Sequence, residues 1–87
     1  MTYQIAKDLS IRIIKEEIFI LKRSTSSIHS FNKTGTMIWN LLQEKKSYSE
    51  ITQLLLVKFE IAGEIIENDL SEFLFSLSEN QLIIMTA

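Results

Sequence analysis

The first third of the chain carries apolar residues in short runs that partly alternate with polar ones. The β-branched and aromatic members of these runs are Ile11, Ile13, Ile18, Ile20, Ile28 and Phe31. A period of two is typical of strands with one buried face. We therefore predict strands near residues 10–15, 18–23 and 27–31. The polar segments Lys15–Glu17 and Ser24–Ser26 are short enough for turns, which predicts an antiparallel meander.

The next part of the chain changes to helical spacing. Asn32 can accept a hydrogen bond from the amides of a first helical turn, and the apolar pattern after it predicts a helix over residues 33–43. Ser47 and Glu50 have the spacing of a capping box, in which each side chain satisfies the backbone of the other residue. This signal predicts that a second helix covers residues 48–59.

A third helix is predicted from about Gly63 to Ser78, after a turn over Glu60–Gly63. The tail Gln81–Met85 is short, apolar and β-prone, so it forms a final strand or folds over the core. The expected core residues include Ile38, Trp39, Leu41, Leu54 and Leu77. A three-stranded antiparallel sheet followed by three helices is an α+β fold, and 87 residues suffice for one domain, residues 1–87.

Composition places the chain among folded proteins. Of its residues, 46% are hydrophobic and 23% are charged, as in an ordinary globular domain. Because the chain has no cysteine, it cannot form a disulfide framework or a thiolate metal site. Residues 1–8 lack a signal-peptide pattern, and no stretch approaches the roughly 18 apolar residues of a membrane helix. We expect a cytoplasmic protein.

The side-chain inventory argues against an enzyme. Catalysis needs a positioned acid, base or nucleophile with a partner, and this chain has one histidine, no cysteine and no glycine-rich phosphate loop. His29 has only hydroxyl side chains near it in sequence, which indicates a strand histidine rather than a zinc ligand. Asp69 and Glu72 have the spacing to chelate a cation, but a solvated acidic face explains them as well. We expect no cofactor and no metal.

A helix, a turn and a helix beside a sheet also describe a winged helix, so nucleic-acid binding is the alternative function. Residues 1–58 hold nine basic and five acidic side chains, whereas residues 59–87 hold six acidic side chains and no Lys or Arg. The helix in the recognition position is therefore acidic and would repel phosphates. This charge pattern opposes a DNA-binding transcription regulator.

The third predicted strand suggests another use. If it lies at the edge of the sheet, an extended peptide can add there as a further strand. Segment Ser24–Ser30 contains no Lys, Arg, Pro, Asp or Glu, the residues that usually discourage such pairing. Two alternatives remain open. A tail or helix covers this edge, or the edge strands of two copies pair to form a homodimer.

The ordered set of motifs resembles the PqqD-like family, the precursor-peptide recognition elements. The resemblance spans about residues 11–83, and the segments that carry it are Phe31–Leu42, Ser47–Ile51, Asp69–Leu70 with Phe73, Leu74 and Leu77, and Leu82–Ile83. Phe31 stands where the family commonly has Leu, and Gln81 where a Gly is common. Both departures concern the subfamily rather than the fold.

The resemblance implies a winged-helix-like domain without catalytic groups. Such a domain binds the leader of a ribosomally made precursor peptide beside its third strand and third helix. It then delivers the peptide to a leader peptidase, a cyclase or a radical-SAM protein. A free-standing domain of this length resembles the separate proteins of lasso-peptide pathways and of pyrroloquinoline quinone assembly, and we favour the lasso type. The implied peptide-binding residues are Ser27, Ile28, His29, Ser30, Phe31, Ile66, Asp69, Leu70 and Phe73.

Charge adds one expectation about the leader. Asp69 and the other acids of the third helix would lie on one side of the peptide, and Lys22 and Arg23 on the other. Charges across an interface mainly set partner choice and association rate. We therefore expect a leader with a Lys or Arg facing the third helix, and an acid near Lys22 and Arg23.

Overall fold

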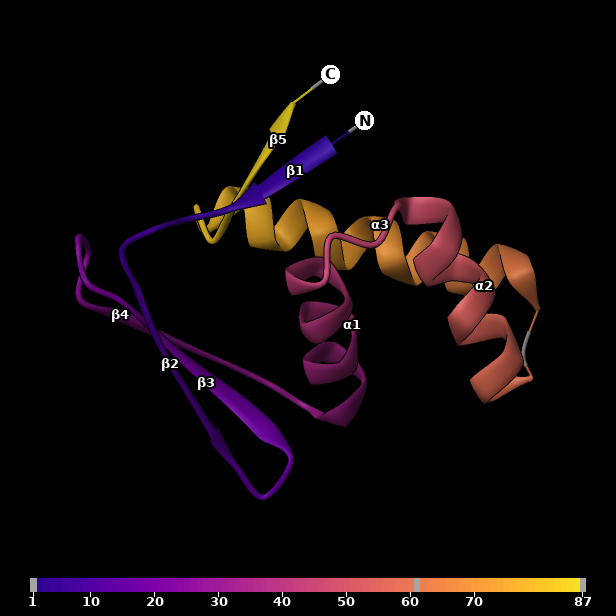
Figure 1. Ribbon diagram of the computed structural model, residues 1–87, viewed down its shortest axis with the longest axis horizontal. Coiled ribbons are helices and arrows are strands. Elements are labelled where there is room, and N and C mark those ends of the chain that lie inside the picture. The colour runs from indigo at the N-terminus through magenta and orange to yellow at the C-terminus, as the bar shows by residue number, and fades with distance from the viewer. Residues whose placement is uncertain (1, 61, 87) are drawn as a thin grey trace.

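The computed structural model describes residues 2–60 and 62–86 and contains two small sheets and three helices (Figure 1). The elements are, in chain order, β1 (Thr2–Ile5), β2 (Leu9–Ile14), β3 (Glu17–Lys22), β4 (Ser27–Phe31), α1 (Lys33–Gln43), α2 (Tyr48–Phe59), α3 (Gly63–Glu79) and β5 (Ile83–Thr86). Strands β2, β3 and β4 form an antiparallel sheet in that order. This confirms the predicted α+β fold, and each predicted strand of this sheet is correct to within one residue.

The three-stranded sheet has one face packed against the helices. Along β3, Ile18, Ile20 and Lys22 are buried, whereas Phe19 and Leu21 point to the opposite face and are partly exposed. This alternation follows from the period of two along a strand. In Figure 1 the three helices lie on one side of this sheet.

The β2–β3 connection is a two-residue turn without glycine. Lys15 and Glu16 both have positive φ angles, 51° and 68°. Two successive residues in this region form the mirror-image turn that matches the right-handed twist of a hairpin. The turn is therefore shorter than predicted, and Glu17 is the first residue of β3.

Helices α1 and α2 begin at the caps expected from the sequence. The Gly35 amide donates to Asn32 Oδ1 at 2.9 Å, and Ser47 and Glu50 form both hydrogen bonds of a capping box. The hydrogen bond from the Ser47 amide lowers the pKa of Glu50. Helix α2 ends at Phe59, and Glu60, its C-cap residue, has the left-handed conformation. The predicted turn over Glu60–Gly63 also includes Ile61, which lies outside the described residues.

The core lies between the sheet and the helices. Its buried hydrophobic residues are Ile18, Ile20, Ile38, Trp39, Leu42, Ile51, Leu55, Ile66, Leu70, Leu74, Leu77, Leu82 and Ile83. The prediction for Leu54 was wrong, because its side chain is 47% exposed. Ile51 and Leu55 face inward, and the 100° rotation per residue turns Leu54 away from them. Leu41 is partly buried and packs against the core.

The two ends of the chain pair with each other. Strand β5 lies antiparallel to β1, with Tyr3 opposite Met85 and Ile5 opposite Ile83 (Figure 1). The predicted final strand therefore exists, and its residue Ile83 also belongs to the core. Strand β1 was not predicted. Among the described helices, none is both long and apolar enough to cross a membrane.

Candidate peptide-binding site

Strand β4 is an edge strand in the part of the chain that the structure describes, since it pairs only with β3. The Ile18 amide donates to Thr36 Oγ1 at 3.0 Å on the β4 side, and the Arg23 amide donates to the Asp8 carbonyl at 2.9 Å on the β2 side. Backbone groups alternate sides along an antiparallel strand. By this alternation, the N–H and C=O groups of Ile28 and Ser30 in β4 point away from the sheet.

The side chains of β4 divide between the two faces of the sheet. Ser27, His29 and Phe31 are half-buried on the helix side, whereas Ile28 and Ser30 are exposed on the other side. Strand β4 therefore presents outward backbone N–H and C=O groups at its edge. Its two faces carry different sets of side chains.

His29 belongs to a short chain of hydroxyl contacts. Its Nε2 atom lies 3.0 Å from Ser27 Oγ, which lies 2.7 Å from Thr25 Oγ1. In the described residues, no three side chains of His, Asp or Glu are placed to hold a metal ion. These contacts match the interpretation of His29 as a strand histidine.

A groove of about 340 Å³ lies between the end of β4, the start of α1 and the middle of α3; we call it the β4 groove. It is lined by Ser30, Phe31, Asn32, Thr34, Gly35, Ile38, Asp69 and Phe73. The Phe31 ring also lies 6.0 Å from that of Trp39. The groove wall therefore includes two aromatic side chains, Phe31 and Phe73, and one acidic group, Asp69.

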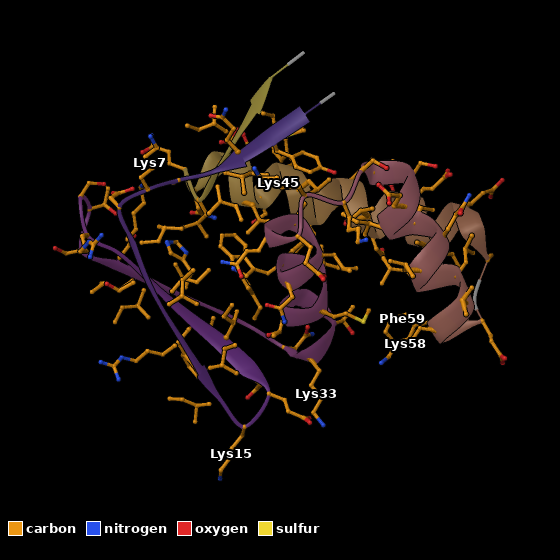
Figure 2. The ribbon with its side chains drawn as sticks, in the orientation of Figure 1. Lys7, Lys15, Lys33, Lys45, Lys58 and Phe59 are labelled. Atoms are coloured by element: carbon orange, nitrogen blue, oxygen red, sulfur yellow. The ribbon has the colours of Figure 1, made fainter. Side chains whose placement is uncertain are left out.

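The β4 groove adjoins a second hollow of about 280 Å³, the α2–α3 pocket, which brings in the end of α2. The two hollows share Thr34, Ile38 and Asp69. Leu55, Phe59, Ile66 and Leu70 complete the lining of the α2–α3 pocket. Figure 2 shows Phe59, with its neighbour Lys58, at the end of α2 on the side of α1. Together the hollows form a largely apolar surface that begins at the edge strand.

The structure places the residues implied by the family resemblance in three settings. Ser30, Phe31, Asp69 and Phe73 line the β4 groove. Ile66 and Leu70 are almost fully buried and reach only the α2–α3 pocket. The remaining three lie along the strand and outside both hollows: Ser27, Ile28 and His29.

Sequence reasoning missed the contribution of α1 and α2 to this surface. Thr34, Gly35 and Ile38 of α1 line it, as does Phe59 of α2. Gly35 was the available signal, because a glycine inside a helix often marks a close approach of another group. A Cβ atom added at Gly35 would lie 2.9 Å from Phe31 Cβ and 3.3 Å from the Phe73 ring.

The expectation that Lys22 meets an acid of the leader was wrong. Lys22 is buried, and its Nζ atom lies 3.0 Å from Asp8 Oδ1. Asp8 also accepts a hydrogen bond from the Ser24 amide. The hydrogen bonds from Ser24 and Lys22 hold the pKa of Asp8 well below its usual range. Arg23 remains exposed, and its Nη1 atom donates to Ser10 Oγ at 3.3 Å.

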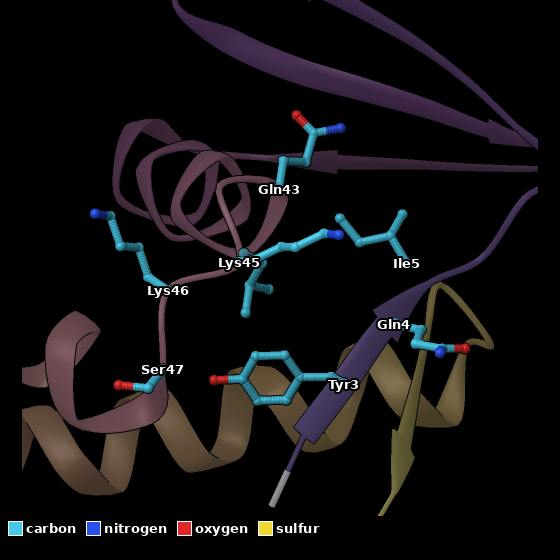
Figure 3. A pocket seen from close by; sticks show the side chains of 8 residues that line it. Tyr3, Gln4, Ile5, Gln43, Lys45, Lys46 and Ser47 are labelled. Carbon is cyan, nitrogen blue, oxygen red and sulfur yellow. The ribbon is translucent and has the colours of Figure 1, made fainter.

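Another cavity, of about 710 Å³, lies elsewhere, between β1 and the connection of α1 to α2. Figure 3 shows Lys45 extending toward Ile5, and the Tyr3 hydroxyl directed toward Ser47. The Tyr3 hydroxyl is buried with no hydrogen-bond partner in the described structure, and this burial raises the pKa of Tyr3. No residue of β4 or α3 lines this cavity, so it is separate from the β4 groove.

The fold is a three-stranded antiparallel sheet followed by three helices, and in the described residues its edge strand β4 borders a largely apolar groove. The family model for coenzyme PQQ synthesis protein D (PqqD) matches residues 17–83, and the chain belongs to the PqqD family. This confirms the resemblance inferred from the sequence motifs. As a PqqD-like recognition element, the domain is not an enzyme.

Two solved structures share the whole fold. One is TbiB1 in complex with the TbiA(beta) leader peptide, with a TM-score of 0.90, 26% identity, and coverage of 97% of this chain and 98% of that chain. The other is a lasso peptide synthetase B1 complexed with the leader peptide, with a TM-score of 0.90, 19% identity, and coverage of 98% and 100%. At 19% identity, the second likeness shows the fold alone. A comparison with curated proteins found no match.

Proposed function

We propose that this domain captures the leader segment of a ribosomally made precursor peptide and delivers it to a modifying enzyme. The observation that carries the proposal is the edge of β4, which has no second strand partner among the described residues, beside a groove lined by Phe31 and Phe73. An edge strand forms main-chain hydrogen bonds with an added peptide, which give affinity. Adjacent hollows accept alternate side chains of the peptide, which gives specificity. The solved structure of TbiB1, similar over its whole length, contains a leader peptide.

The leader adds as a strand along β4. Its backbone pairs with the outward N–H and C=O groups of Ile28 and Ser30. Alternate side chains of the added strand then point to opposite faces of the sheet. One set enters the β4 groove against Phe31 and Phe73, and the other set extends the open face that carries Ile28.

Charge selects among peptides with suitable apolar residues. Asp69 borders both hollows, and α3 also carries Glu64, Glu67 and Glu72. A Lys or Arg of the leader that faces α3 therefore meets a negative field. The same field opposes nucleic acid, because phosphates would approach acidic side chains.

Delivery to an enzyme is the second part of the proposal. The domain binds the leader and leaves the core of the precursor free for a leader peptidase, a cyclase or a radical-SAM protein. We favour a cytoplasmic lasso-peptide pathway, in line with the resemblance of the sequence motifs to the recognition proteins of such pathways.

The test is a titration of the labelled domain with the leader of the precursor peptide encoded beside its gene. Amide signals of Ser27–Phe31 and of the first half of α3 should shift together. A scrambled leader of equal composition serves as the control, because it keeps charge and hydrophobicity. Shifts confined to β1, β5 and the cavity near Lys45 would contradict strand addition at β4.

A further inference from the structure

The three-stranded sheet has a second face, turned away from the helices, and this face carries an apolar strip. Phe19 and Leu21 of β3 are 36% and 37% exposed there, and Ile28 of β4 is 73% exposed. The strand register places Leu21 beside Ile28, and Phe19 beside Ser30. The strip therefore runs across two strands up to the edge where the leader would add. Contiguous exposed apolar residues of this kind mark interaction sites more often than isolated ones do.

Cationic side chains border the strip on its β2 side. Arg12 lies beside Phe19 in the register, and Ser10 lies beside Leu21. The Arg23 guanidinium donates to Ser10 Oγ and so extends over the same face. In the described structure, neither arginine forms an ion pair. Aromatic residues and arginine are enriched in the parts of interfaces that contribute most binding energy.

We propose that this open sheet face docks the enzyme that receives the leader. The partner surface would place apolar side chains on Phe19, Leu21 and Ile28, and carboxylates opposite Arg12 and Arg23. The inference rests on the proposed function in one respect, because it takes the receiver of the leader as the occupant. It adds where that receiver binds and which chemistry it presents.

The position of the strip explains how docking and loading are linked. A leader strand beside β4 sends its outward side chains to the same face, next to Ile28 and Ser30. The enzyme then contacts the domain and the leader at once. A loaded domain offers the enzyme a larger surface than an empty one, so the enzyme binds the loaded domain more tightly.

A second copy of the chain fits this face less well. Its matching negative surface would be α3, which lies on the opposite side of the molecule from the open face (Figure 1). Contact between two different surfaces of identical chains is head to tail. Such contacts build open filaments unless the rotation between successive copies closes them into a ring. The occupant is therefore a different protein.

The experiment measures binding of the purified modifying enzymes encoded in the same gene cluster to the full chain, with and without leader. Two variants alter the open face, Leu21→Thr in the central strand and Arg12→Glu. Threonine retains the β preference of the position. Matched controls change residues elsewhere, Val57→Thr on α2, where the side chain is 81% exposed, and the exposed lysine in Lys7→Glu.

We expect one of these enzymes to bind, and to bind the loaded chain at least threefold more tightly than the empty one. Each open-face variant should weaken this complex at least tenfold, whereas both controls and the leader affinity of Arg12→Glu should stay within twofold of the wild type. An enzyme complex that is insensitive to both variants, or no complex with any of these enzymes, would overturn the inference. Failure of the wild-type chain to bind its leader would instead overturn the proposed function, whatever the enzyme result.

Discussion

The rings of Phe31 and Phe73 meet edge to face, with centroids 5.2 Å apart and planes inclined by 75°. One ring ends the edge strand β4 and the other belongs to α3, so the contact joins the two elements of the proposed peptide site. An aromatic pair of this geometry contributes about 0.5–1.5 kcal/mol beyond its buried area. The neighbouring α1 leaves room for this contact only because residue 35 is a glycine.

Gly35→Ala should therefore disturb both stability and binding. The added Cβ would lie 2.9 Å from Phe31 Cβ, so the backbone or the ring must shift. Overpacking of this kind costs about 1–3 kcal/mol, which exceeds the gain of up to about 1 kcal/mol from alanine in a helix. Chemical denaturation and leader titration measure the two effects.

Gly63→Ala is the matched control for this substitution, because it makes the same change in another helix. A Cβ there would have Leu56 at 3.7 Å as its nearest neighbour, which is ordinary contact. We expect unchanged or slightly higher stability and an unchanged leader affinity. Equal effects of the two substitutions would refute the steric role of Gly35.

Ile28→Pro should abolish or greatly weaken leader binding while the domain stays folded. Proline removes an N–H group, and the Ile28 N–H points out from the edge of the sheet rather than toward β3. Proline is tolerated at such positions of edge strands. Isothermal titration with the leader measures the loss, and a thermal melt confirms folding.

Ile13→Pro makes the same change on the opposite edge of the sheet. The pairing of Arg23 with Asp8 puts the N–H of Ile13 on the outer side of β2 by the same alternation. We expect unchanged leader affinity. Equal loss in both variants would show that the leader does not choose the β4 edge.

Asp69→Lys should weaken leader binding without unfolding the domain. Asp69 is exposed and borders both hollows, and substitution at an exposed helix position usually changes stability by no more than about 0.5 kcal/mol. The loss of leader affinity should come largely from a slower association rate, and it should become smaller as salt is added. Glu79→Lys is the control, because Glu79 is an exposed acid at the end of the same helix and lines neither hollow. An unchanged affinity and rate for Asp69→Lys at low salt would remove Asp69 from the site.

Asp8 should make the stability of the domain depend on pH in the acid range. Its pKa in the folded state is lowered, chiefly by hydrogen bonds from Ser24 and Lys22. A lowered folded pKa gives stability that is present above the unfolded value, near pH 4, and is lost as pH falls below it. Asp8→Asn should therefore lower the melting temperature at pH 7, and its effect should decrease steadily as the pH falls from 4 to 2.

The control for Asp8 is Glu16→Gln. Glu16 also forms an ion pair, with Lys33 at 3.2 Å, but both side chains are 76% exposed. Such exposed ion pairs contribute little to the free energy of unfolding. Thermal melts across pH 2 to 8 should show a clear difference between the two variants. Parallel pH profiles for Asp8→Asn and the wild type would contradict the role of the Asp8–Lys22 pair.

The sequence alone determined the elements that depend on neighbouring residues. The helices after Asn32 and Ser47 begin as predicted, because a cap is a contact between residues three apart. The three strands of the main sheet follow from the period of two in the same way. The family motifs lie on these local features, so the sequence also sufficed for the family, which the match over residues 17–83 confirms.

Only the tertiary structure decided which residues from distant segments meet. Strand β1 exists because the last residues of the chain pair with it, and no local pattern in four residues could show that. Lys22 looked like a free surface charge until the fold placed it over Asp8.

The groove is the clearest case of such a meeting. The β4 groove requires α1 to approach Phe31 and Phe73 at Gly35, and the adjoining α2–α3 pocket requires α2 to end beside α3 at Phe59. A sequence pattern reports the direction of each side chain within its own element. Which helices and strands contact one another depends on packing across the whole chain. This packing decided the shape of the site.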